Sequence, residues 1–133
     1  MKKETTVESL RRFNIIMGGL HLIQGLMMIV LGLSLTQLGD FKLRIYQHYL
    51  TFVETAPGEG YLDFARDEVF TLPFFFLVAS FLLISAGAHA LISLPKKIND
   101  IYNKDLQKGI NKLRWFEYAL SSSVMIVLIS YLF

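Results

Sequence analysis

The sequence contains no cysteine, and its charged residues are few. Without cysteine the chain has no disulfide framework, no thiolate metal ligand and no thiol nucleophile. Lys, Arg, Asp and Glu make up only 18% of the 133 residues, whereas 53% are hydrophobic and the mean hydropathy is +0.46. This composition excludes an ordinary water-soluble domain. The net charge of +2 is by itself weak evidence. We expect no nucleic-acid partner, no catalytic residue, no metal site and no enzymatic activity.

The few charges leave long runs without any Asp, Glu, Lys or Arg. Residues 13–39 and 69–95 form two such runs of 27 residues, and a helix needs only about 20 residues to cross a hydrocarbon core about 30 Å thick. A third run, 118–133, reaches this length if it begins near Trp115 and includes Glu117. The first run exceeds the apolar core of a signal peptide, and no cleavage site follows it.

These runs predict an all-α membrane protein with a single domain over residues 1–133. The expected helices are at about 13–36, 70–94 and 113–133, with an outer loop at 37–69 and a cytoplasmic loop at 95–112. The expected surroundings of the three helices are the lipid bilayer.

Lysine and arginine are distributed unequally between the segments that flank these runs. Ten of the 13 precede the first run or lie between the second and the third: Lys2, Lys3, Arg11, Arg12, Lys96, Lys97, Lys104, Lys108, Lys112 and Arg114. The first loop holds the other three, Lys42, Arg44 and Arg66. Because basic residues near a membrane favour the cytoplasmic side, we predict a multi-pass protein of the cell membrane with a cytoplasmic N-terminus.

The two connecting loops carry structure of their own. Residues 42–54 are rich in aromatic and β-branched residues with partial alternation, and Pro-Gly-Glu-Gly at 57–60 is a turn signal. We predict a small β-hairpin that lies over the outer membrane face, followed by Pro73 in the first turn of the second helix. Residues 96–114 predict a short amphipathic segment at the inner surface, broken near Gly109.

Three ionisable side chains interrupt the apolar runs. Counted at 1.5 Å per residue from the inner helix ends, His21 lies about 12 Å inside the membrane, and His89 and Glu117 lie about 8 Å inside. Ionisable groups are unfavourable in a bilayer and usually face a functional cavity. Each also has a simpler interpretation, because a histidine can hydrogen-bond a neighbouring helix and Glu117 can pair with Arg114 on the same helix face. Their common depth favours a shared cavity but identifies no ligand.

Small residues lie close to these histidines in the first two apolar runs. Gly18, Gly25 and Gly32 share one helix face with His21, and residues 85–88 are Ser-Ala-Gly-Ala. Glycines on one seam let another backbone approach closely, so we predict that the first two spans pack together.

Two other functional classes remain open on these residues alone. His21 and His89 could be the axial ligands of a haem, which would make the chain an electron-transfer module. Alternatively, the glycine seam could bind a partner helix, and the chain would be a small non-catalytic membrane subunit.

The sequence also resembles a known family. Residues 114–127 read RWFEYALSSSVMIV and closely resemble the third helix of heliorhodopsins. Residues 11–14, RRFN, and 19–25, GLHLIQG, resemble their first helix. The resemblance extends over essentially the whole chain.

Heliorhodopsins are seven-helix, light-sensing retinal proteins with a cytoplasmic N-terminus. The resemblance implies that Glu117 is the counterion of the protonated retinal Schiff base. It also implies that His21, His89 and Ser121 line the polar cavity beside all-trans retinal. The outer hairpin matches one associated with dimer contacts, so a homodimer is expected; no signalling partner is implied.

The chain departs from the family in one respect. The family attaches retinal to a lysine of the seventh helix, whereas every lysine here lies near a terminus or in a predicted loop: Lys2, Lys3, Lys42, Lys96, Lys97, Lys104, Lys108 and Lys112. We therefore expect a fragment that represents the first three helices of a seven-helix bundle and cannot attach retinal covalently.

Overall fold

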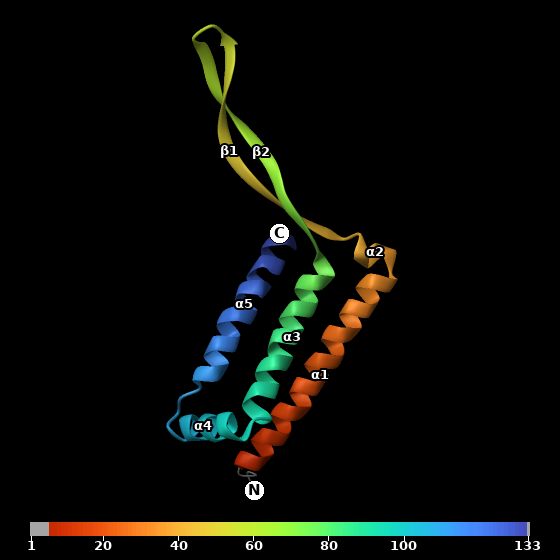
Figure 1. Cartoon of the computed structure of the whole chain (residues 1–133), viewed down its shortest axis with the longest axis vertical. Coiled ribbons are helices and arrows are strands. Elements are labelled where there is room, and N and C mark those ends of the chain that lie inside the picture. The colour runs from red at the N-terminus through yellow and green to blue at the C-terminus, as the bar shows by residue number, and fades with distance from the viewer. Residues whose placement is uncertain (1–5, 133) are drawn as a thin grey trace.

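The computed structural model describes residues 6–132, and three long helices and a β-hairpin dominate it (Figure 1). In chain order the elements are α1 (Val7–Ser34), α2 (Thr36–Gly39), β1 (Lys42–Ala56), β2 (Glu59–Pro73), α3 (Phe74–Ser93), α4 (Lys96–Gln107) and α5 (Lys112–Leu132). Lys2, Lys3 and Phe133, which entered the expectations above, lie outside the described residues. The helices α1, α3 and α5 are long and apolar enough to cross a membrane, as predicted.

The three long helices form one layer, with α3 packed against both α1 and α5 (Figure 1). Helix α1 begins at Val7, six residues before the expected boundary. The Thr6 side chain accepts a hydrogen bond from the Ser9 amide and caps the helix, and Arg12 pairs with Glu8 at 2.7 Å one turn apart. The charged segment before the apolar run is therefore helical as well.

The close packing of α1 on α3 depends on the glycine seam, as predicted. A Cβ atom on Gly18 would lie 2.9 Å from the Cβ of His89, and one on Gly25 would lie 2.9 Å from the side chain of Leu83. At Gly32 an added Cβ would overlap the ring of Phe75. These three glycines therefore let the two helices come closer than larger residues would allow.

We expect Gly32→Ala to lower the unfolding temperature of the detergent-solubilised chain. The added methyl overlaps the buried Phe75 ring, and overpacking of this kind costs about 1–3 kcal/mol. The matched control is Gly19→Ala on the same helix, where nothing lies within 4 Å; it should leave stability unchanged or raise it, because Ala favours a helix. Equal unfolding temperatures for the two variants would contradict the close contact.

The two strands form a single antiparallel hairpin, paired from Lys42 opposite Pro73 to Ala56 opposite Glu59. The turn contains Gly58, whose φ of +79° is readily adopted only by glycine. Each strand has 15 residues, which at about 3.3 Å per residue gives a length of about 50 Å.

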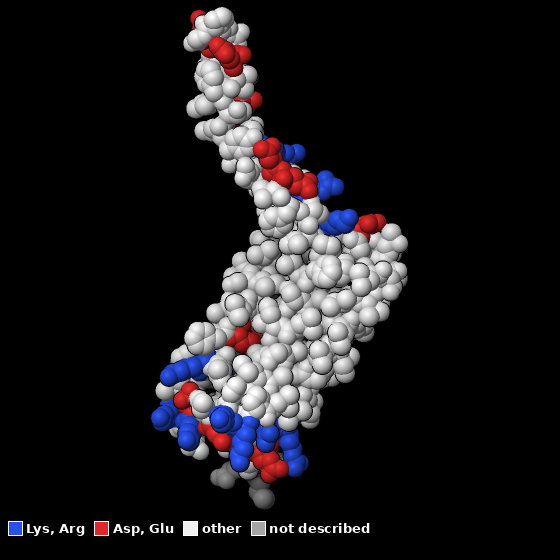
Figure 2. Space-filling view, in the orientation of Figure 1, with Lys and Arg blue, Asp and Glu red and all other residues white. Residues whose placement is uncertain are grey.

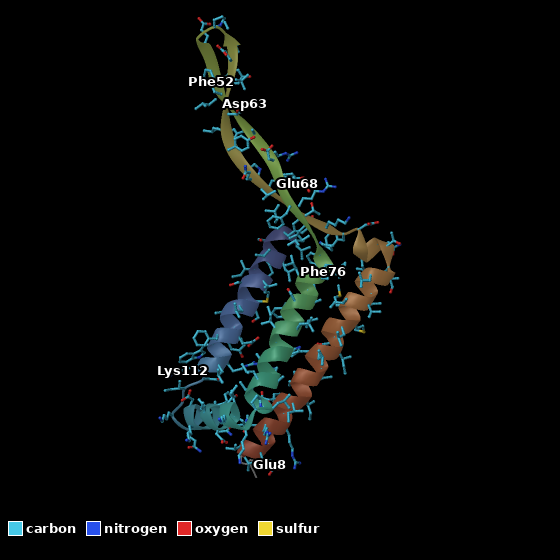
Figure 3. The ribbon with its side chains drawn as sticks, viewed as in Figure 1. Glu8, Phe52, Asp63, Glu68, Phe76 and Lys112 are labelled. Carbon is cyan, nitrogen blue, oxygen red and sulfur yellow. The ribbon has the colours of Figure 1, made fainter. Side chains whose placement is uncertain are left out.

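The prediction of a two-stranded β-hairpin in the first loop is confirmed, and its strands are longer than the expected strand pair. The hairpin is long and projects away from the helices, with Phe52 and Asp63 in its distal half (Figures 1 and 3). The base of the hairpin is fixed by the first turn of α3, because β2 continues into α3 without a loop. The Phe74 amide donates to the Phe41 carbonyl at 2.9 Å and joins the two sides at this point.

The start of the second long helix also differs from the expectation. Helix α3 begins at Phe74 rather than at residue 70, and Pro73 is the extended last residue of β2, with φ −62° and ψ 129°. Residues 70–73 pair with residues 42–45 across the hairpin, and this pairing outweighs their apolar continuity with the helix.

Side chains anchor the hairpin at its base and along its length. The rings of Phe41, Phe74 and Tyr131 cluster with centroids 4.8–6.4 Å apart, and the Tyr131 hydroxyl donates to the Lys42 carbonyl at 3.0 Å. This cluster connects the last turns of α5 to the hairpin. Farther out, the Tyr49 hydroxyl donates to Asp67 at 2.8 Å, and this hydrogen bond raises the pKa of Tyr49.

Helix α4 lies across the other end of the long helices, opposite the hairpin (Figure 1). We call the two ends the α4 end and the hairpin end. Asn99 of α4 donates to the Ile92 carbonyl in the last turn of α3 at 2.8 Å, and Tyr102 is buried. The predicted break is confirmed, because Gly109 has a φ of +73° just after the helix ends.

Candidate functional site

A cluster of polar side chains is buried between the long helices at the α4 end. Each is less than 9% exposed on a predominantly apolar helix: Asn14 of α1, Ser85 and His89 of α3, and Glu117 and Ser121 of α5. Buried polar groups need hydrogen-bond partners, so their contacts decide what the cluster can do.

His89 is fixed by one side chain from each neighbouring helix. Its Nδ1 lies 3.1 Å from Oδ1 of Asn14, and its Nε2 lies 3.2 Å from Nη1 of Arg114. A guanidinium can only donate, so Nε2 accepts and carries no proton. Nδ1 then carries the proton and donates to Asn14. These partners assign a neutral imidazole with a defined tautomer.

Glu117 has a hydrogen bond on one carboxylate oxygen and a longer ion-pair contact on the other. Its Oε1 accepts a hydrogen bond from the Ser85 hydroxyl at 2.8 Å. Its Oε2 lies 3.6 Å from Nη1 of Arg114 and has no hydrogen-bond partner among the described residues. Arg114 also donates to the Tyr118 hydroxyl at 2.9 Å and lies over that ring, 4.8 Å from its centroid. The guanidinium is thus divided between His89, Glu117 and Tyr118, and Oε2 of the carboxylate is left without a hydrogen bond among the described residues.

His21 lies next to His89 without a hydrogen bond between them. The two rings are stacked, with centroids 5.7 Å apart and an interplanar angle of 18°. Within residues 6–132, Nδ1 of His21 is buried and has no partner. Of the two histidines, His21 is therefore the one with an uncommitted ring nitrogen.

These groups surround one cavity of about 350 Å³. Its lining residues come from α1, α3 and α5: His21, Phe81, Ser85, His89, Arg114, Glu117, Tyr118, Ser121, Ser122 and Met125. The four residues selected from the sequence, His21, His89, Glu117 and Ser121, are thus together. The pairing of Glu117 with Arg114, which the sequence offered as a competing interpretation, coexists with the cavity.

Sequence reasoning missed two members of the network. Asn14 precedes His21 by seven residues and Ser85 precedes His89 by four, so each lies on the same helix face as its histidine. That spacing is the signal that would have identified them. Ser123 does not belong to this network, because its hydroxyl donates to the Ala119 carbonyl of its own helix.

The geometry does not support either of the other two functional classes. Both ring nitrogens of His89 are engaged, so neither is free to bind haem iron. Gly18, Gly25 and Gly32 are covered by α3 of the same chain and do not present a free seam. The described residues also contain no group of three or more His, Asp or Glu side chains that could hold a metal ion.

Comparison with known proteins agrees with the earlier resemblance. No curated protein sequence matches the chain. A sequence model of the family described as heliorhodopsin, however, matches residues 10–133. The matched region holds the hairpin, most of α1, all of α3 and every side chain of the buried network. The chain therefore belongs to the heliorhodopsin family.

Proposed function

We propose that this chain forms the first three helices of a retinal-binding light sensor, in which Glu117 is the counterion of the protonated retinal Schiff base. The observation that carries the proposal is the buried carboxylate. Glu117 lines the cavity, and Ser85 holds its Oε1 by a hydrogen bond. Its Oε2 is buried 3.6 Å from the Arg114 guanidinium and makes no hydrogen bond within residues 6–132. A buried carboxylate whose second oxygen makes no hydrogen bond is stabilised further by a positive charge brought close to that oxygen.

The other lining residues fit the same ligand. Phe81, Tyr118 and Met125 offer aromatic and apolar surface for a polyene, and Ser121 and Ser122 add hydroxyl groups near the charge. When bound, retinal supplies the absorption of light and a positive charge at its Schiff-base nitrogen.

The attachment point lies elsewhere in this proposal. The lysines of the described residues belong to β1, to α4 and its following turn, and to the first residue of α5. None of them lines the cavity. We therefore assign covalent attachment to a lysine on a helix outside this sequence, as the family resemblance implies.

The chain's own groups then have separate roles. Glu117 balances the positive charge, and Ser85 holds the carboxylate in place. His89 stays neutral between Asn14 and Arg114 and positions the guanidinium. His21 has the uncommitted nitrogen, so we assign it a polar contact to the bound ligand within the cavity.

We also propose an orientation and an assembly. The unequal distribution of Lys and Arg supports a cell-membrane protein whose α4 end faces the cytoplasm and whose hairpin faces outward. The family resemblance supports a homodimer to which the outer hairpin contributes.

Attachment can be tested with the chain itself. After incubation with retinal and reduction with borohydride, the 133-residue chain should carry no retinal on any single lysine, because no lysine lines the cavity. Mass spectrometry of peptides is the measurement. The positive control is the chain fused to helices four to seven of a heliorhodopsin, which should carry one retinal and absorb visible light. A stoichiometric adduct on the chain alone, or a colourless fusion, would contradict the proposal.

A further inference from the structure

Basic side chains gather at the α4 end, as the blue atoms around its lower surface show in Figure 2. The arginines there have partners. Arg11 donates to the Ser93 carbonyl at 2.9 Å, Arg12 pairs with Glu8, and Arg114 belongs to the buried network. The lysines are different: five are exposed, and none forms an ion pair with a carboxylate of residues 6–132. They are Lys96, Lys97, Lys104, Lys108 and Lys112.

The lysines lie mainly on the side of α4 that faces away from the bundle. Asn99 and Tyr102 are buried and attach the opposite side to the rest of the protein. Positions 97, 101, 104 and 108 follow a spacing of four, three and four residues, which is one face of a helix continued into its cap. This outer face therefore presents three lysines around Ile101, which is 56% exposed.

The depth of α4 relative to the membrane follows from the length of α3. The 20 residues of α3 extend over about 30 Å, which matches the hydrocarbon core of a bilayer. Helix α4 begins three residues after α3 ends and lies across the ends of the long helices (Figure 1). Helix α5 then returns to the apolar region from Lys112, at the other end of the loop (Figure 3). Both ends of α4 are thus held close to the hydrocarbon boundary, at the level of lipid headgroups.

Exposed apolar side chains border the lysines on the membrane side. Leu94 is 62% exposed just before α4, and Trp115 and Phe116 are 60% and 72% exposed in the first turns of α5. Apolar and aromatic side chains next to lysines are typical of the membrane–water interface. A soluble acidic partner would contact the lysines but leave these apolar side chains uncovered. A lipid has an acyl chain for the apolar side chains and a charged headgroup for the lysines.

We propose that the lysines of α4 and its following turn, together with Lys112, bind the headgroups of anionic phospholipids. The binding sites are the exposed ammonium groups, and the acyl chains of the same lipids lie against the apolar border that includes Trp115. The surface thereby gives this end of the protein a preference for an anionic leaflet, independently of any chromophore.

The single tryptophan of the chain provides the test, because Trp115 lies one helical turn after Lys112. The 133-residue chain is reconstituted in vesicles that contain either brominated phosphatidylglycerol or brominated phosphatidylcholine, and quenching of Trp115 gives the relative binding constant of the two lipids. We expect phosphatidylglycerol to be preferred about fivefold for each lysine in contact, decreasing as salt is added.

Substitutions identify the groups responsible. Trp115 reports the lipids beside Lys112, at the α5 end of the loop, rather than those beside Lys96 and Lys97 at the start of α4. The triple variant Lys104→Gln, Lys108→Gln, Lys112→Gln should therefore bring the relative binding constant measured at Trp115 close to one, while the same three positions changed to Arg should keep the preference. The matched control, Lys42→Gln with Arg44→Gln, removes charge at the hairpin end and should change nothing. Equal quenching by the two lipids in the parent chain would overturn the proposal. The lysine face of α4 would then be a binding surface for an acidic soluble partner instead. A preference that survives the triple Gln variant, or is lost in the hairpin control, would overturn it as well.

Discussion

Replacing Glu117 by Gln should shift the absorption of the completed seven-helix pigment to longer wavelength. The pigment is the chain fused to helices four to seven of a heliorhodopsin. A carboxylate beside the Schiff base stabilises the positive charge where it lies before light is absorbed. Excitation moves that charge along the polyene, so the carboxylate raises the energy required. Gln keeps nearly the same shape without the negative charge, and the energy of absorption falls.

The same substitution should make the Schiff base lose its proton at lower pH. An opposite charge within about 4–6 Å favours the protonated cation, and its removal should lower the midpoint of the colour change by about 1–3 pH units. The measurement is a spectrophotometric pH titration of the parent and the variant.

Two controls separate charge from packing at this position. Glu117→Asp keeps the negative charge and should retain most of the parent titration. His21→Ala should have a smaller effect, because that imidazole lies in the cavity and makes no contact with Glu117 within hydrogen-bond distance among the described residues. An unchanged spectrum and an unchanged midpoint in Glu117→Gln would return Glu117 to a single role, the partner of Arg114 at 3.6 Å.

The polar site could be predicted from sequence because depth in a membrane follows from counting residues. His21, His89 and Glu117 lie on three helices, and the uniform rise of an α-helix places them at one level without knowledge of the packing. The partners of each group could not be counted in this way. The contact of Asn14 with His89 depends on the rotation of α1 against α3, which the close approach at Gly18 determines.

The boundary between strand and helix was misjudged for a related reason. Residues 69–72 are Val-Phe-Thr-Leu, which suit a β-strand at least as well as a helix and carry no charge to mark a boundary. Their state depends on residues 42–45, which lie on the other strand and pair with 70–73. Local sequence identified the turn at 57–60, but the length of the pairing depends on contacts between residues distant in the chain.

The absence of cysteine makes the proposed orientation testable with one reactive group at a time. Glu59→Cys places a thiol at the tip of the hairpin, and Gln107→Cys places one at the last residue of α4. Both native side chains are exposed, so a difference in labelling reflects the side of the membrane rather than burial. Intact cells are treated with a membrane-impermeant maleimide, and a second sample is labelled after permeabilisation.

We expect nearly complete labelling at position 59 and almost none at position 107 in intact cells, with equal labelling of both after permeabilisation. The physical reason is the cost of moving lysine and arginine across the bilayer: the α4 end carries most of the basic residues, and the hairpin end carries Lys42, Arg44 and Arg66 among six acidic residues. A chain in the opposite orientation would give the reverse pattern. That result would place the hairpin in the cytoplasm and remove the argument that links the charge distribution to the family's orientation.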